Sequence, residues 1–190
     1  MKKISELLEA AADRAVLVVD GISDAGLGDT TPCAEYDVRD LINHLFQVVV
    51  NFQILAAKGE ADFGETPKFV TDDWRARFRE ETAKLVVAWD APGAEDGTTG
   101  AMGLPARTVG NMVLGDLTVH AWDLARATGQ EFVPDESVLN EIGPALAAMA
   151  PMAREAKVFG EAYPVPEGAG PFERVLALTG RDPGWRPPRA

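Results

Sequence analysis

Apolar residues recur at every third or fourth position through most of this chain, a spacing that places one apolar stripe along an α-helix. Helices are predicted at about 4–20, 37–58, 72–89, 106–128, 135–157 and 171–179. No segment shows the sustained alternation of apolar and polar residues that is typical of a β-strand. The pattern therefore predicts an all-α protein in which four or five long helices pack as a bundle.

The expected helix ends carry residues that start or stop helices. Gly21 follows the first apolar stripe, Asp37 stands where an N-cap precedes the second, and Gly129 follows the fourth as a C-terminal cap. Two prolines, Pro144 and Pro151, fall inside the fifth helix. Because proline lacks the amide hydrogen and clashes with the preceding turn, we expect these two residues to kink or break that helix.

Two segments lack helical periodicity. The connection 92–104 contains four glycines and is long for a loop inside a compact domain, so it is a candidate lid over a functional site; alternatively, it only bridges two ends of the bundle. The segment from Phe159 onward is rich in proline. We expect residues 1–158 to form the helical bundle and residues 159–190 to form a tail packed on it within the same domain.

Charge narrows the range of partners. The 190 residues carry a formal net charge of −12, which would repel a phosphate backbone, so nucleic acid and anionic membranes are not expected partners. The apolar runs are too short to span a membrane. The acidic residues Glu6, Glu9 and Asp13 interrupt what would be the apolar core of a signal peptide, so we expect a cytoplasmic protein. A homodimer is compatible with the sequence.

Cys33 is the only cysteine, which excludes an intramolecular disulfide and a cysteine-rich zinc site. We expect it to fill space beside Pro32, because nothing near it in sequence would lower the pKa of its thiol.

The chemistry-bearing residues of the helix at 106–128 fall within its apolar stripe. Asp116, His120 and Asp123 share that arc, and burying such groups is costly unless they are paired or bind a metal. Asp116 and His120 are four residues apart, so one helix could offer both to a single metal ion. If the helix at 37–58 is a neighbour, His44 joins them as a set of two histidines and one carboxylate. Three protein ligands would leave one position open, as in a catalytic metal site.

A metal-free interpretation accounts for the same spacing. Asp116 could simply hydrogen-bond to His120, because interior histidines usually bond to a carboxylate or a carbonyl. Asp123 could orient a metal-bound imidazole or pair with an arginine such as Arg39 or Arg126. We expect Trp122 to lie on the outer or flanking face of its helix.

Two segments carry a resemblance to a known family. Residues 31–45, TPCAEYDVRDLINHL, and residues 116–129, DLTVHAWDLARATG, resemble the two motifs of the DinB-like, mycothiol-dependent maleylpyruvate isomerase N-terminal superfamily. The Phe159-Gly160 piece and the stretch 176–183 resemble its shorter actinobacterial members. The resemblance implies a DinB-like four-helix bundle that binds a divalent metal through His44, Asp116 and His120.

The metal implied by the resemblance is usually zinc, and two imidazoles suit zinc, nickel or iron better than magnesium. The isomerase motif has glutamate where this chain has Asp116. Full isomerases carry a further C-terminal domain with substrate-binding residues. A chain of 190 residues has no room for it, so we do not expect maleylpyruvate isomerase activity itself.

Two function classes follow from these residues and the resemblance. In the first, an enzyme of the transferase or isomerase-like kind binds a low-molecular-weight thiol such as mycothiol at the open metal position and acts on a small molecule; hydrolysis by a metal-bound hydroxide is a variant. In the second, the bundle binds metal without turnover, for storage, sensing or interaction. Asp123 is the only candidate for a general base or supporting catalytic group.

Overall fold

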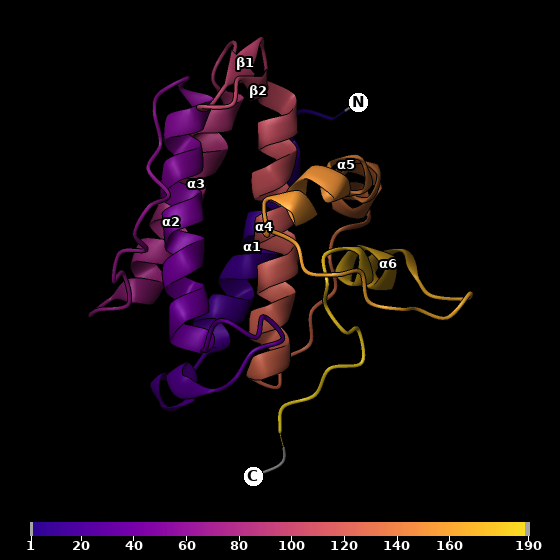
Figure 1. Ribbon diagram of the computed structural model, residues 1–190. Helices are drawn as coiled ribbons and strands as arrows, with labels where there is room; N and C mark the ends of the chain where they lie inside the picture. The colour runs from indigo at the N-terminus through magenta and orange to yellow at the C-terminus, as the bar shows by residue number, and fades with distance from the viewer. Residues whose placement is uncertain (1, 189–190) are drawn as a thin grey trace.

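Four long helices build the bundle in the computed structural model, which describes residues 2–188 (Figure 1). The helices are α1 (Ile4–Gly21), α2 (Val38–Ala56), α3 (Trp74–Asp90) and α4 (Ala106–Ala127). Helix α1 packs against α3 and α4, and α2 packs against the same two helices, so α1 and α2 are diagonal partners. The prediction of an all-α helical bundle is confirmed.

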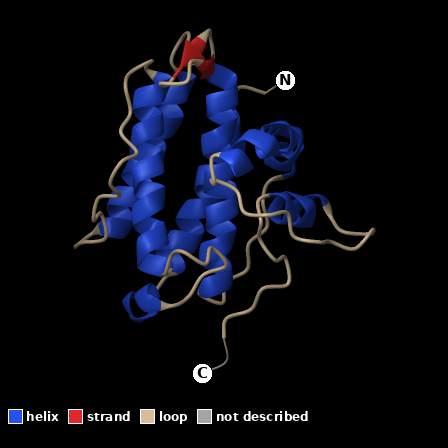
Figure 2. Cartoon of the chain, viewed as in Figure 1, coloured by secondary structure: helices blue, strands red, loops and turns tan. Residues whose placement is uncertain are grey.

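Two further helices flank the bundle. Helix α5 (Glu136–Glu155) packs mainly against α4, and α6 (Pro171–Leu178) packs against α5. The remaining regular elements are a short 3-10 helix, η1 (Asp24–Gly28), and an antiparallel pair of two-residue strands, β1 (Thr98–Thr99) and β2 (Leu104–Pro105). Figure 2 shows the strands at one end of the bundle and the long irregular stretches of the C-terminal part.

Helix α4 is covered from two directions because two small residues allow close packing. A Cβ atom on Gly110 would lie 2.9 Å from Cγ2 of Ile4 in α1, and one on Gly115 would lie 3.0 Å from Cδ2 of Leu146 in α5. Trp122 is also buried, which corrects the expectation of an outer or flanking position. The apolar stripe predicts only the side of α4 that faces the bundle, whereas α5 and the tail cover the other side.

The predicted helix ends agree with the structure to within one or two residues. The side chain of Asp37 caps α2 by accepting a hydrogen bond from the amide of Asp40, and Asp135 caps α5 in the same way. Helix α5, however, continues through Pro144 and Pro151. Both prolines are exposed and seven residues apart on one face, so water can hydrogen-bond to the carbonyl groups that lose their helical partners.

The connection 92–104 is tied to the bundle. The hydroxyl of Thr99 donates to the carbonyl of Leu55 at 2.7 Å, and Lys58 Nζ donates to the carbonyls of Ala94 and Asp96 at 2.7 and 2.8 Å. The connection ends at the start of α4, ten residues before Asp116, which is roughly 15 Å along the helix. These contacts favour a bridge between bundle ends over a lid.

The tail folds back onto itself and packs against α5. The amide of Tyr163 donates to the carbonyl of Ala177 at 2.9 Å, and Arg154 Nη2 donates to the carbonyl of Leu178 at 2.7 Å. Farther along, Trp185 lies against α4, where its carbonyl accepts a hydrogen bond from Arg126, and it lines a pocket with Thr30 and Thr31 of the loop before α2. The outermost residues of the expected ranges 1–158 and 159–190, residue 1 and residues 189–190, lie outside the described part. Within residues 2–188, no helix combines the length and apolar character that a membrane span needs.

Candidate functional site

The two histidines of the chain meet across the interface between α2 and α4. The ring centroids of His44 and His120 are 5.1 Å apart, and the ring planes are nearly perpendicular at 86°. The predicted condition, that the two helices are neighbours, is therefore met. The hydrophobic stripes of both helices turn these residues inward, so two imidazoles from segments far apart in sequence share one place.

A buried carboxylate pairs with one ring nitrogen of His120. Its Nδ1 atom lies 3.0 Å from Oδ2 of Asp123, a residue with 0% of its surface exposed. When Nδ1 carries the proton, it donates to this carboxylate and the lone pair of Nε2 is free to bind another group. The other oxygen of Asp123, Oδ1, is buried without a hydrogen-bond partner among the described residues.

The arginine that pairs with Asp123 comes from the tail. Arg181 Nη2 lies 3.2 Å from Oδ2 of Asp123 and 3.4 Å from Nδ1 of His120, while its Nη1 donates to the carbonyl of Thr179 at 2.8 Å. Neither Arg39 nor Arg126 plays this role. Sequence reasoning missed Arg181 because no local periodicity links it to a residue 58 positions earlier.

Arg126 instead anchors the end of the tail. Its Nη2 donates to the carbonyl of Trp185 at 2.7 Å, and its guanidinium lies 5.9 Å from the centre of the Trp122 ring. The tail is thus bound to α4 twice, through Asp123 and through Arg126.

Tyr36 completes the surroundings of His44. The two rings are stacked with centroids 5.4 Å apart and an interplanar angle of 19°. The hydroxyl of Thr31 donates to the carbonyl of Tyr36 at 2.8 Å and lies 2.9 Å from the carbonyl of Cys33, which fixes the loop that holds the ring. Tyr36 lies in the segment that carries the family resemblance, but its spacing does not predict a functional role.

Burial and neighbouring charges set the protonation of the site. Burial, together with the positive charges that His120 and Arg181 can carry, lowers the pKa of His44 from 6.5 to about 4. His44 is therefore a neutral imidazole at pH 7, the form that binds metals. Burial raises the pKa of Asp116, and the opposing charges of His120 and Arg181 only partly offset this effect.

The thiol of Cys33 is not activated. It is free and partly buried, and burial raises its pKa despite the nearby charge of Arg181. Since the thiolate is the nucleophile, Cys33 is a poor candidate for catalysis.

The histidine pair fits a metal better than the full predicted set does. Two imidazoles that bind one tetrahedral zinc through nitrogen at about 2.0–2.1 Å would place their centroids roughly 5 Å apart, close to the separation seen here. Among residues 2–188, however, no three side chains of histidine, cysteine, aspartate or glutamate are already arranged to hold a metal ion. The assignment of Asp116 as third ligand thus stays a prediction.

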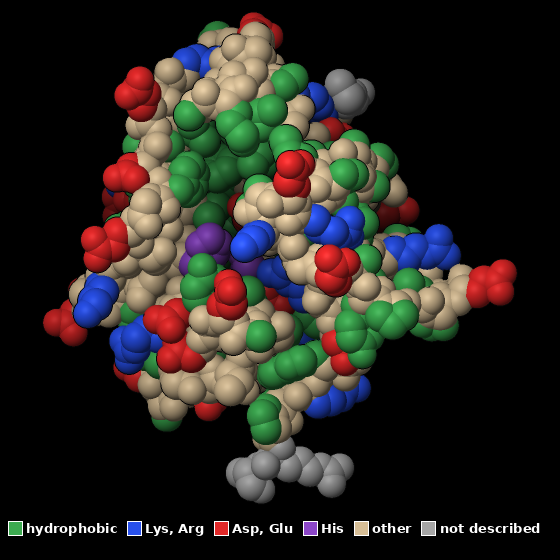
Figure 3. All heavy atoms as spheres, viewed as in Figure 1, with side chains coloured by type: hydrophobic (Ala, Val, Ile, Leu, Met, Phe, Trp, Pro, Cys, Tyr) green, Lys and Arg blue, Asp and Glu red, His purple; other side chains and the backbone are tan. Residues whose placement is uncertain are grey.

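The site reaches the molecular surface. Figure 3 shows histidine atoms at the base of a hollow, with hydrophobic side chains on the wall above them and basic side chains beside them. A small molecule could approach the imidazoles there with an apolar part against that wall.

The all-α bundle with this histidine pair is a DinB-like fold. The chain belongs to the mycothiol maleylpyruvate isomerase N-terminal domain family, whose model matches residues 8–125. This range includes His44, Asp116, His120 and Asp123 but not Arg181.

Relatives and solved structures extend the likeness beyond that range. The uncharacterized proteins MT0763 and Rv0738 of Mycobacterium tuberculosis are each 30% identical over 180 residues, which cover 91% of this chain and 94% of theirs. Two crystal structures of mycothiol-dependent maleylpyruvate isomerase, one of them a mutant, superpose with TM-scores of 0.55 and 0.53 at 18% and 19% identity. Each superposition covers 86% of this chain and 78% of the other, and it shows a shared fold.

Proposed function

We propose that this protein is a metal- and thiol-dependent enzyme of the transferase or isomerase-like kind that acts on a small molecule. The observation that carries the proposal is the pair of imidazoles, His44 and His120, that face each other at 5.1 Å with Asp123 behind one of them. The family membership supports a low-molecular-weight thiol such as mycothiol as the cofactor.

His44, Asp116 and His120 would hold the metal, with zinc favoured because two of the three ligands are imidazoles. Once bound, a divalent metal with an open position would lower the pKa of a bound thiol and present it as a thiolate. The raised pKa of Asp116 in the metal-free protein fits a carboxyl group whose charge lacks a close partner until a cation is present.

The chain's own residues would then orient an imidazole, attract the ligand and limit the access of water. Asp123 holds the Nδ1 side of His120, which directs Nε2 toward the open space. Arg181 places a positive charge beside the imidazoles, where it can attract an anionic ligand or a carboxylate on the substrate. Tyr36 covers one face of His44 and limits access of water.

The reaction class is addition of a thiol to an electrophilic carbon. The sulfur–carbon bond forms while the electrophile's π electron pair accepts a proton; elimination of the thiol after a bond rotation would give an isomerase-like outcome. The added thiol must come from outside the chain, since Cys33 is its only cysteine and is not activated. We place the reaction in the cytoplasm, where such thiols are kept reduced.

A thiol-dependence assay tests the proposal. Zinc-loaded protein, metal-stripped protein and the zinc-treated His44→Ala variant are each incubated with a panel of small electrophiles, with and without mycothiol. Turnover should require both metal and thiol and should fall at least a hundredfold in the variant. Metal binding without turnover on any electrophile would instead support a storage, sensing or interaction role, and turnover that is equal in metal-stripped protein would contradict the proposal.

A further inference from the structure

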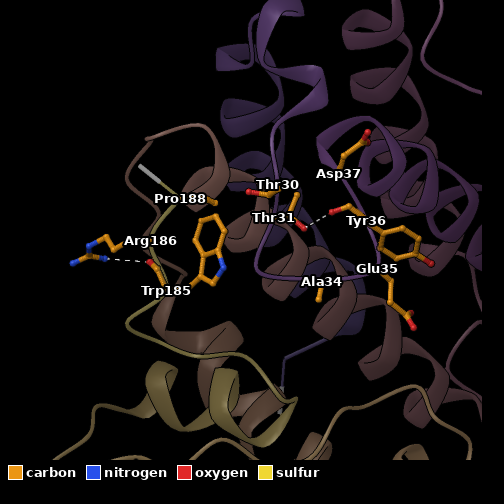
Figure 4. A pocket seen from close by; sticks show the side chains of 9 residues that line it. All are labelled: Thr30, Thr31, Ala34, Glu35, Tyr36, Asp37, Trp185, Arg186 and Pro188. Atoms are coloured by element: carbon orange, nitrogen blue, oxygen red, sulfur yellow. Dashed lines mark hydrogen bonds between the residues drawn. The ribbon is translucent and has the colours of Figure 1, made fainter. Parts of the chain in front are cut away.

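A groove lies beside the histidine pair, between the loop before α2 and the C-terminal tail. Its volume is ≈ 440 Å³, within the range of small-molecule sites. Thr30, Thr31, Ala34 and Tyr36 line it on the loop side, and Trp185 and Arg186 line it on the tail side. Figure 4 shows the indole ring of Trp185 standing opposite Thr30, Thr31 and Ala34.

One residue, Tyr36, links the groove to the candidate metal site. Tyr36 lines the groove and also stacks on His44 with ring centroids 5.4 Å apart. A ligand whose reactive end approaches the imidazoles can therefore extend past Tyr36 into the groove. This position favours the body of the ligand that reacts at the site over an unrelated molecule.

Both walls are held in place. The carbonyl of Trp185 accepts a hydrogen bond from Arg126 Nη2 at 2.7 Å, and its amide donates to the carbonyl of Asp182 at 3.0 Å. On the other side, the hydroxyl of Thr31 fixes the loop through the carbonyl of Tyr36. A wall that is ordered before binding loses little conformational entropy when a ligand enters.

The lining chemistry suits a sugar ring. One face of a pyranose consists of C–H groups that pack against an aromatic ring, and Trp185 supplies a broad aromatic surface. The hydroxyl groups at the ring edge need hydrogen-bond partners, and exposed Thr30, Arg186 and Glu35 border the groove. The mixture of an apolar wall and a few polar groups is typical of a specific small-molecule site.

We infer that this groove binds the sugar portion of a glycosylated thiol while its thiol end reaches His44 and His120. The inference rests on the proposed function and adds to it the residues that would distinguish mycothiol, whose thiol is carried on an acylated amino sugar, from a simple thiol. Trp185 is then the residue that determines specificity.

Binding of two thiols by zinc-loaded protein, measured by titration calorimetry, tests this inference. Mycothiol contains the sugar, whereas N-acetylcysteine retains only the thiol end. Wild-type protein should bind mycothiol at least tenfold more tightly. Trp185→Ala should weaken mycothiol binding about five- to tenfold and leave N-acetylcysteine binding unchanged, and Trp185→Phe should retain most of the preference.

Two other variants distinguish an effect of the groove on thiol preference from general damage to the fold. Ala34→Phe fills the groove from the loop side without removing any tail contact, and it should also reduce the preference for mycothiol. Val87→Ala, on the exposed face of α3 away from the groove, should not change it. Unchanged N-acetylcysteine binding shows that the tail variants are folded.

The inference fails if wild-type protein binds both thiols equally, or if Trp185→Ala and Ala34→Phe leave the preference intact. If wild-type protein binds neither thiol, the proposed function fails as well. The two failures are therefore distinguishable.

Discussion

Oδ2 of Asp123 lies between an imidazole and a guanidinium, 3.0 Å from Nδ1 of His120 and 3.2 Å from Nη2 of Arg181. One buried carboxylate thus joins an imidazole of α4 to a guanidinium of the tail. This arrangement links the stability of the C-terminal segment to the geometry of the candidate metal site.

Removal of this carboxylate should strongly destabilise the protein. In Asp123→Ala, the guanidinium of Arg181 stays buried without its counter-charge, and losing one partner of a buried ion pair costs about 3–5 kcal/mol. Urea unfolding of the metal-free protein measures the loss. Asp123→Ala combined with Arg181→Leu should recover much of it, whereas Asp24→Ala, which breaks an exposed ion pair with Arg75, should change little. Equal losses in the single and double variants would show that the pair is not the cause.

Metal affinity should distinguish the two aspartates of α4. Asp116→Ala should weaken zinc binding more than Asp123→Ala, because Asp116 is assigned as a ligand and Asp123 only orients His120. A lost orienting partner typically costs 10- to 100-fold in affinity. Asp116→Glu should retain zinc, since glutamate is the ligand that the family resemblance implies. Competition titration with a chromophoric chelator measures these affinities, and a larger effect at Asp123 would reverse the assignment.

Acid should destabilise the metal-free protein through His44. Its pKa is lowered to about 4 in the folded state, against 6.5 when unperturbed. The unfolded chain therefore binds the proton first as pH falls, and up to roughly 3 kcal/mol of stability is lost between about pH 6.5 and pH 4. Denaturant unfolding after chelation measures this slope. His44→Gln should have a shallower slope over the same window, and identical slopes would refute the burial of a neutral imidazole.

The backbone next to Arg181 should tolerate no side chain. Gly180 has φ +87°, and a Cβ atom there would lie 2.9 Å from Cα of Gly160. Gly180→Ala should therefore cost more than Gly129→Ala, where φ is +70° and nothing lies within 4 Å of the added atom. We expect about 1 kcal/mol for Gly129 and about 2–3 kcal/mol for Gly180 in thermal unfolding. Similar losses for both would show that the contact with Gly160 is not restrictive.

Local sequence signals predicted most of the fold. Periodicity and end signals such as Gly21, Asp37 and Gly129 act within a few residues, and the helices they predict are present with nearly the expected bounds. The prolines of α5 were misleading because their cost depends on whether water can reach the freed carbonyl groups. Exposure of this kind is a property of the packed molecule rather than of the local sequence.

The site was predicted only where it lies on helices. The spacing of Asp116, His120 and Asp123 places them on one face of α4, and the pairing of α2 with α4 brings in His44. Arg181 depends on the return path of the tail, which tertiary contacts decide. The Phe159-Gly160 piece has a physical role that resemblance alone could not supply, because Gly160 packs against Gly180 beside that arginine.

The metal content of the purified protein tests the central claim most directly. Elemental analysis after dialysis against zinc should give one divalent metal per chain for wild-type protein and less than a tenth of that for His44→Ala and His120→Ala, with helical circular dichroism unchanged in both variants. A wild-type protein that binds no metal under these conditions, or a histidine variant that retains full stoichiometry, would contradict the account.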